Sequence, residues 1–151
     1  MLHSLLVCEP DGTLRLAHYF LETSPEEQVA FELAAARSTA HLWAASGAAT
    51  IPADIDDRLS TIVATFDGLV HVVSGARDGG ATEASLADDA ERLACIVKDV
   101  CNGNPVAKLS NPDFCGKAVV ALEQAACGGV LAYPGADNTL RMAKLKGPKT
   151  A

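Results

Sequence analysis

The feature that most constrains the fold is a pair of β-branched segments separated by Asp67-Gly68. Residues 59–66 read LSTIVATF, and residues 69–74 read LVHVVS. Short apolar segments rich in Val, Ile and Thr favour strands, and Asp-Gly between two such segments is typical of a two-residue hairpin turn. The sequence therefore predicts an antiparallel hairpin over residues 59–74, followed by a flexible turn over residues 75–80.

A second hairpin is predicted at the start of the chain. Residues 2–8, LHSLLVC, form a short apolar run typical of a buried strand, and EPDG at residues 9–12 supplies Pro, Asp and Gly for a tight turn. Residues 13–20 then alternate between the two faces of a strand. One face carries Leu14, Leu16, His18 and Phe20, and the other carries Thr13, Arg15, Ala17 and Tyr19.

The first predicted helix begins at Ser24-Pro25-Glu26-Glu27. The serine can accept the first free N–H groups, the proline suits the first helical position, and Glu27 completes a capping box. Both acids also favour the positive end of the helix dipole. We expect the helix to end between residues 40 and 45. Its predicted inward face consists of Val29, Leu33, Ala36 and Ala40.

Two further helices are predicted in the second half of the chain. One begins near residue 85 and ends at about residue 101, before NGNP at residues 102–105. The other spans residues 112–127 behind an Asn111 cap and ends at two glycines. The apolar stripe of the first is Leu86, Ala90, Leu93, Val97 and Val100, and the inward face of the second is Phe114, Ala118, Ala121, Leu122 and Ala125.

Three connections carry weaker signals. Residues 48–51 can form a short strand, residues 106–109 are predicted to be extended or irregular, and residues 130–133 fit either a turn or a short strand. The predicted order is strand, strand, helix, two or three strands, helix, helix. This order favours an α+β fold in which helices pack on an antiparallel sheet of about five strands.

Length and charge indicate one globular domain. A chain of 151 residues can bury a sizeable core, so we expect residues 1–134 to form a single domain and residues 135–151 a flexible basic tail. The basic residues of that tail are Arg141, Lys144, Lys146 and Lys149. The formal net charge of the whole chain is −7. Since phosphate binding needs a basic face, nucleic acid is not expected as a partner.

No pattern of catalytic or metal-ligating residues stands out in the sequence. The five cysteines and four histidines are scattered, and the phosphate-binding and nucleophile-elbow glycine motifs are missing. No segment approaches the ~20 apolar residues of a membrane span, and no signal peptide is recognised. We therefore expect a cytoplasmic protein without catalytic activity, metal or cofactor. His18 and His71 are interpreted as partly buried rings with backbone partners.

Four stretches together resemble the small subunits of vesicle coats. They are LLVCEPDGTLRLAHYF (residues 5–20), TSPEEQVAFE (23–32), STIVATFDGLVHVVSG (60–75) and AVVALEQAACGGVL (118–131). In this pattern the chain is similar to longin-fold proteins, namely the sigma chains of clathrin adaptor complexes and the zeta chain of coatomer. The resemblance implies a longin-like fold with the order β-β-α-β-β-β-α-α.

The resemblance also implies a scaffolding role beside a large partner subunit. The resemblance further implies that sorting-signal peptides are cargo. It also implies a peripheral location on endomembranes or coated vesicles, with membrane contact only through the complex. The predicted interface lies on the first hairpin and first helix. Its candidate residues are Leu14, Leu16, Tyr19, Phe20, Val29, Phe31, Leu33 and Trp43. The sequence leaves open whether Trp43 anchors an interface or seats its helix on the sheet.

A second class of function remains open on the sequence alone. A longin-like or roadblock-like regulatory module pairs with another small chain and acts with a small GTPase. A tethering-complex subunit of the transport-particle type belongs to the same class. The identity of the stoichiometric partner distinguishes this class from a coat subunit.

Overall fold

Two antiparallel hairpins and one short strand form a single five-stranded sheet. The computed structural model describes residues 1–43, 50–126 and 129–131. The strands are β1 (Leu2–Cys8), β2 (Leu14–Tyr19), β3 (Ile51–Ala53), β4 (Leu59–Phe66) and β5 (Leu69–Ala76). The helices are α1 (Pro25–Trp43), the 3₁₀ turn η1 (Arg77–Gly79), α2 (Glu83–Val100), α3 (Pro105–Lys108) and α4 (Pro112–Ala125).

The strand order is β2-β1-β5-β4-β3, and every neighbouring pair is antiparallel. The Asp67-Gly68 turn joins β4 to β5 as predicted, because Phe66 pairs with Leu69 and both turn residues have positive φ, 54° and 79°. Such angles define a two-residue turn whose twist matches that of the strands. The sequence prediction of an α+β fold with an antiparallel sheet is confirmed.

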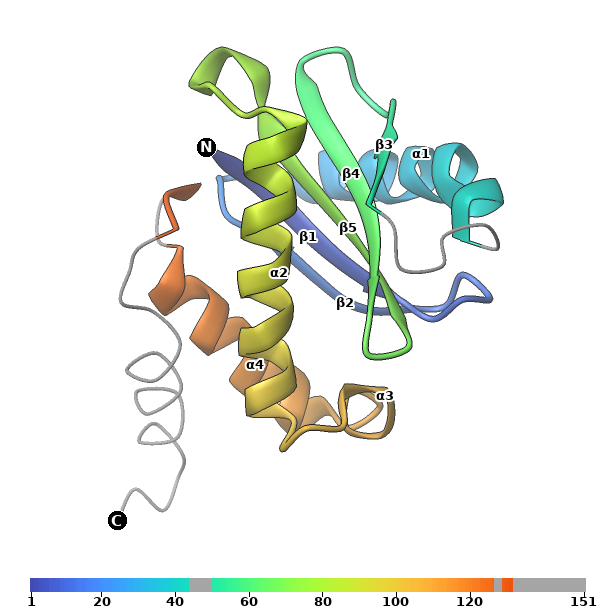
Figure 1. Ribbon diagram of the computed structural model, residues 1–151, viewed down its shortest axis with the longest axis vertical. Coiled ribbons are helices and arrows are strands. Elements are labelled where there is room, and N and C mark those ends of the chain that lie inside the picture. The colour runs from blue at the N-terminus through green and yellow to red at the C-terminus, as the bar shows by residue number, and fades with distance from the viewer. Residues whose placement is uncertain (44–49, 127–128, 132–151) are drawn as a thin grey trace.

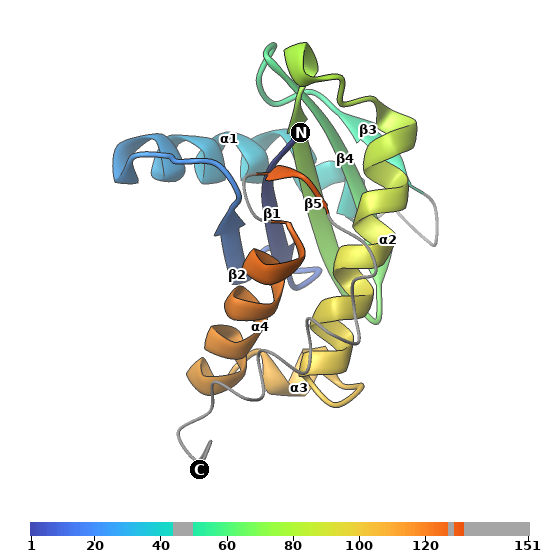
Figure 2. The same cartoon turned by 90° about the vertical axis from the view of Figure 1, so that its left-hand side faces the viewer.

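Helices cover both faces of the sheet (Figures 1 and 2). The helices α2 and α4 lie on one face and enclose the larger core, in which the predicted α2 stripe from Leu86 to Val100 is buried. The helix α1 lies across the other face, where it covers a smaller cluster that includes Leu6, Val63 and Val72. β1, β5 and β4 are the interior strands, so most of their side chains are buried on both faces of the sheet.

The rotation of α1 about its axis differs from the prediction. The side chains of Val29 and Leu33 are 59% and 54% exposed, and Ala36 is exposed as well. Phe31 and Ala35 face the sheet instead. The predicted inward face was therefore wrong for the three residues that the structure describes; the side chain of Ala40 lies outside the described residues.

The aromatic ring of Phe31 accounts for this rotation. It packs edge-on against His3 and Tyr19, with ring centroids 5.1 and 6.2 Å away. The Tyr19 hydroxyl also donates to Glu32 Oε2 at 2.7 Å and to the Gln28 carbonyl at 3.3 Å. A buried aromatic ring removes more apolar area from water than a valine or leucine. The Phe31 side of α1 therefore faces the sheet, and the Val29 side faces solvent.

Three connections also differ from the sequence predictions. β5 continues to Ala76 and is followed by η1, where a flexible turn was expected. Residues 105–108 form a helical turn instead of an extended segment, because Asn104 caps the backbone N–H of Ala107 and Pro105 occupies the first helical position. β3 lies at residues 51–53, beyond most of the predicted strand at 48–51, of which residues 48 and 49 lie outside the described residues.

Several other boundaries match the sequence predictions. β1, β4 and the start of α4 fall where the apolar runs and the Asn111 cap placed them. The helix α2 starts two residues earlier than expected, with a capping box between Thr82 and Ser85. Residues 129–131 contain no strand. The predicted end of α4 at residue 127, residues 132–133 and the tail at 135–151 lie outside the described part of the chain.

Candidate partner-docking surface

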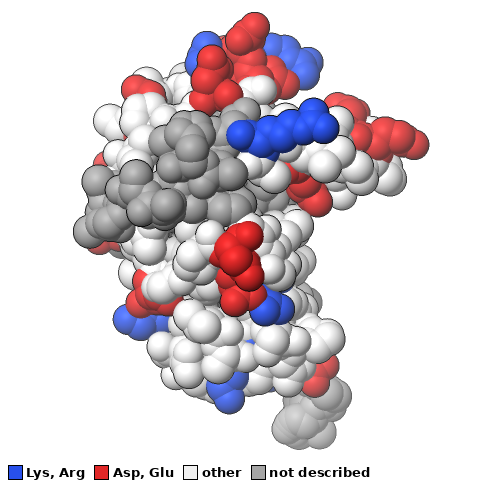
Figure 3. Space-filling model, turned by 90° about the vertical axis from the view of Figure 1, so that its right-hand side faces the viewer, with Lys and Arg blue, Asp and Glu red and all other residues white. Residues whose placement is uncertain are grey.

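An apolar groove opens beside α1 on the face that α2 and α4 leave uncovered. It has a volume of about 260 Å³ and is walled by α1, residues of β1 and β5, the β1–β2 turn and the start of β2. Leu14, Val29 and Leu33 line it and are 40%, 59% and 54% exposed. These three residues and the groove between them are called the α1 groove below. Figure 3 views the molecule from this side and shows uncharged surface between groups of charged side chains.

The α1 groove exists because two flanks of α1 are apolar and the sheet covers one of them. Val29, Leu33 and Ala36 recur at spacings of four and three, which places them along one flank of a helix. Gly12 and Leu14 of the first hairpin form the opposite wall. Among the described residues that line the groove, Glu32 is the one with a charged side chain. The lining suits apolar side chains of another protein better than a polar small molecule.

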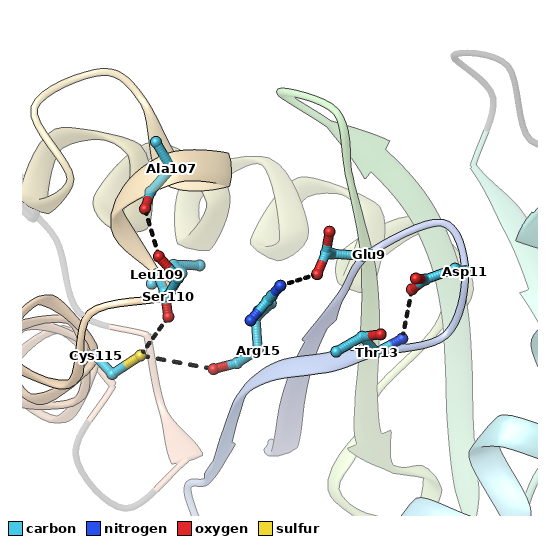
Figure 4. A network of polar contacts seen from close by, with 8 residues as sticks. All are labelled: Glu9, Asp11, Thr13, Arg15, Ala107, Leu109, Ser110 and Cys115. Carbon is cyan, nitrogen blue, oxygen red and sulfur yellow. Dashed lines mark hydrogen bonds and ion pairs between the residues drawn. The ribbon is translucent and has the colours of Figure 1, made fainter.

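The first hairpin is held in place by a polar network at its tip (Figure 4). The Asp11 carboxylate accepts the backbone N–H of Thr13 at 2.9 Å, and Arg15 forms an ion pair with Glu9. These contacts fix the turn that leads into Leu14. Hydrogen bonds and an ion pair therefore stabilise the hairpin that forms one wall of the α1 groove.

The same network continues to the α3–α4 connection (Figure 4). The Cys115 thiol donates to the Leu109 carbonyl at 3.1 Å and lies 3.6 Å from the Arg15 carbonyl. The Ser110 hydroxyl donates to the Ala107 carbonyl at 2.8 Å. The hairpin tip is thus tied to residues about 100 positions later in the chain.

The buried titratable groups are held in their neutral forms. Burial raises the pKa of the Cys8 thiol to about 11, with a further rise from the Glu32 carboxylate. Burial also raises the pKa of Cys101 to about 11. Burial lowers the pKa of His71 to about 4, although the hydrogen bond with the Leu69 carbonyl acts to raise it. A nucleophile needs a lowered thiol pKa or an adjacent base, and Cys8 and Cys101 have raised values.

The candidate interface residues fall into three groups. Leu14, Val29 and Leu33 line the α1 groove. Leu16, Phe20 and Phe31 are 5%, 4% and 8% exposed and contribute to the core, so they are not available to a partner as the structure stands. Tyr19 is half-buried beneath α1, and the side chain of Trp43 lies outside the described residues. Alternation along β2 would have assigned Leu16 and Phe20 to the buried face.

The exposure of Leu14 could not be predicted from the alternation of residues in the strand. Leu14 shares a face with Leu16 in the predicted strand, but the register between β1 and β2 shifts between Val7 and Cys8. Cys8 pairs with Leu14, whereas Val7 pairs with Leu16, so Arg15 is an extra residue on β2. A bulge of this kind redirects the side chains beyond it. Leu14 consequently lines the α1 groove.

Comparisons with known proteins reveal a likeness of fold and not of sequence. No family model matches the chain, and no curated protein matches it in sequence. Among solved structures 19 chains match. One belongs to a homology model of the full-length AP-3 complex in a stretched open conformation, with a TM-score of 0.70 and 12% sequence identity. The match covers 99% of this chain and 95% of that chain.

The fold is longin-like. The five-stranded antiparallel sheet and its flanking helices agree with the order that the sequence resemblance implied. The short helix α3, which interrupts the connection between α2 and α4, is an addition to that order. None of the helices described is long and apolar enough to cross a membrane. The groups of His, Cys, Asp and Glu in the described residues include no cluster that could hold a metal ion.

Proposed function

We propose that the chain is a non-enzymatic small subunit of an adaptor-type complex of membrane traffic. In this proposal it scaffolds a larger subunit, which docks on the α1 groove. The exposed apolar side chains of Leu14, Val29 and Leu33, on a fold like that of an adaptor-complex chain, are the observation that carries the proposal. Apolar surface of this kind is stabilised when a partner removes it from water.

Three further observations support the proposal. The described residues of the groove lining offer almost no polar groups with which to orient a small substrate. The buried thiols Cys8 and Cys101 have raised pKa values, which disfavours a covalent mechanism at either residue. The match covers nearly the whole length of both chains. A peripheral location on coated membranes, with contact through the larger subunit, follows from the same proposal, as does a contribution to the recognition of sorting-signal peptides.

The test is affinity purification of the tagged chain from its source cells, with identification of the stoichiometric partners by mass spectrometry. We expect a large helical subunit to co-purify with the wild-type chain. The double substitution Val29→Glu and Leu33→Glu places two charges in the α1 groove and should abolish that co-purification. Because both side chains are more than half exposed, the fold should be retained.

The matched control is Val106→Glu on α3. Val106 is 48% exposed and therefore resembles Val29 in residue type and accessibility, but it lies outside the groove lining. It should leave the partner in place. Equal loss of partner in the control and the double variant would contradict a docking role for the α1 groove. Recovery of a second small chain together with a GTPase would replace the coat proposal with the regulatory class.

A further inference from the structure

The edge strand β2 pairs with β1 alone within the described part of the chain, so its outer backbone groups have no partner strand there. The backbone N–H of Phe20 donates to the His3 carbonyl at 2.9 Å, and β2 keeps that register back through His18 to Leu16. In an antiparallel pair, alternate residues bond to the neighbouring strand and the residues between them point their backbone groups away. The N–H and C=O of Ala17 and Tyr19 therefore point out of the sheet. Figure 2 shows β2 as the outermost strand.

The opposite edge of the sheet is protected, whereas β2 is not. β3 has three residues and contains Pro52, which has no N–H to donate to an added strand. β2 has six residues and no proline. Its one charged residue, Arg15, is paired with Glu9. Short edges, prolines and charges are the usual protection against an added strand, and β2 lacks them from Leu16 to Tyr19.

A carboxylate lies on each side of this open edge. The helix α1 extends past β2 on one face and supplies Glu32, which accepts the Tyr19 hydroxyl at 2.7 Å (Figure 2). The helix α4 on the other face supplies Glu123, whose Oε2 lies 3.5 Å from Nε2 of His18 and whose side chain is 47% exposed. The Nε2 atom is buried and makes no hydrogen bond within the described residues. The adjacent strand residues His18 and Tyr19 thus contact carboxylates on opposite faces of the sheet.

We propose that the edge of β2 binds an extended basic segment of another protein, which adds a sixth strand to the sheet. The backbone of this segment pairs with Ala17 and Tyr19. Lys or Arg side chains at two neighbouring positions point to opposite faces of the new strand, where they reach Glu32 and Glu123. This site meets the α1 groove at Glu32, which also lines the groove, but its backbone pairing at Ala17 and Tyr19 does not depend on the groove having a partner.

The test is the binding of a fluorescent nine-residue peptide to the full chain, measured by anisotropy. The probe alternates Val and Thr around a central Lys-Arg pair. We expect saturable binding that weakens with added salt, because ion pairs at an exposed edge are screened. Replacement of Lys-Arg by Gln-Gln should weaken binding several-fold. Methylation of the peptide nitrogens that face β2 should abolish it, since the backbone bonds can no longer form.

A substitution in β2 provides the complementary test. Ala17→Pro removes an N–H that points away from β1, so the β1–β2 hydrogen bonds are kept. The substitution should lower the affinity for the probe about tenfold. Ala17→Val keeps the N–H and should bind the probe as the wild type does.

The outcomes separate this inference from the proposed function. No saturable binding of the Lys-Arg probe, or equal binding of its N-methylated form to the wild type, would overturn the inference and leave the α1 groove unaffected. Circular dichroism checks that Ala17→Pro is folded. If it is not, the N-methylated probe on the wild-type chain decides the question alone.

Discussion

Leucines on opposite sides of the fold allow a direct test of which helix surface is core. Leu93 on α2 is fully buried between the sheet and α4, whereas Leu33 on α1 is 54% exposed. Leu93→Ala removes buried carbon atoms and leaves a cavity, which should lower the free energy of unfolding by about 3 kcal/mol. Leu33→Ala should change it by no more than about 0.5 kcal/mol, since alanine also has the higher helix propensity.

The measurement is equilibrium unfolding in urea, followed by circular dichroism, with thermal melts as a second readout. For a domain of this size, a loss of about 3 kcal/mol lowers the melting temperature by roughly 6–12 °C. The m-value should stay the same in both variants, because the surface exposed on unfolding hardly changes. A loss for Leu33→Ala equal to that for Leu93→Ala would refute the assignment of the α1 groove as free surface in the isolated chain.

Three further substitutions test local features of the structure. His71 has a pKa of about 4 in the folded protein and 6.5 in the unfolded chain, so unfolding takes up a proton between these pH values. The free energy of unfolding should therefore fall by about 3 kcal/mol as the pH drops from 6.5 to 4. His71→Gln should flatten this pH dependence in urea titrations. Gly68→Ala should cost about 1 kcal/mol in the same assay, because φ is +79° at that position. Ser24→Ala should cost about 1 kcal/mol, since its Oγ accepts the Glu27 N–H at 3.2 Å, and a loss in helical ellipticity should accompany it.

Local signals were sufficient for much of the secondary structure. β1 and β4 match their apolar runs, the Asp67-Gly68 turn matches its dipeptide, and α4 begins behind Asn111. In each case neighbouring residues in the chain supply the cause, whether a turn that requires positive φ or a side chain that caps an N–H. The helical turn at α3 had such a signal too, because Asn104-Pro105 is a cap followed by a first-turn proline.

Which of the candidate interface residues are exposed was only partly predictable, because exposure in β2 depends on contacts between strands and not on neighbouring residues in the chain. Alternation in β2 places Leu14 with Leu16, but the shift in register at Cys8 separates them. That shift depends on how the two strands pair, which no short segment specifies. The unpaired edge at Ala17 and Tyr19 has the same origin, since strand order decides which strand is outermost.

By itself, the sequence determined the α+β class, the two hairpins, the three long helices and the inward stripe of α2. These follow from periodicity, caps and turn residues that act within a few positions. Only the tertiary structure decided the rotation of α1. The helix has apolar residues on more than one flank, so periodicity could not choose between Val29 and Phe31. The choice was made by the sheet beneath it, where the Phe31 ring packs against His3 and Tyr19, and by the hydrogen bond from Tyr19 to Glu32.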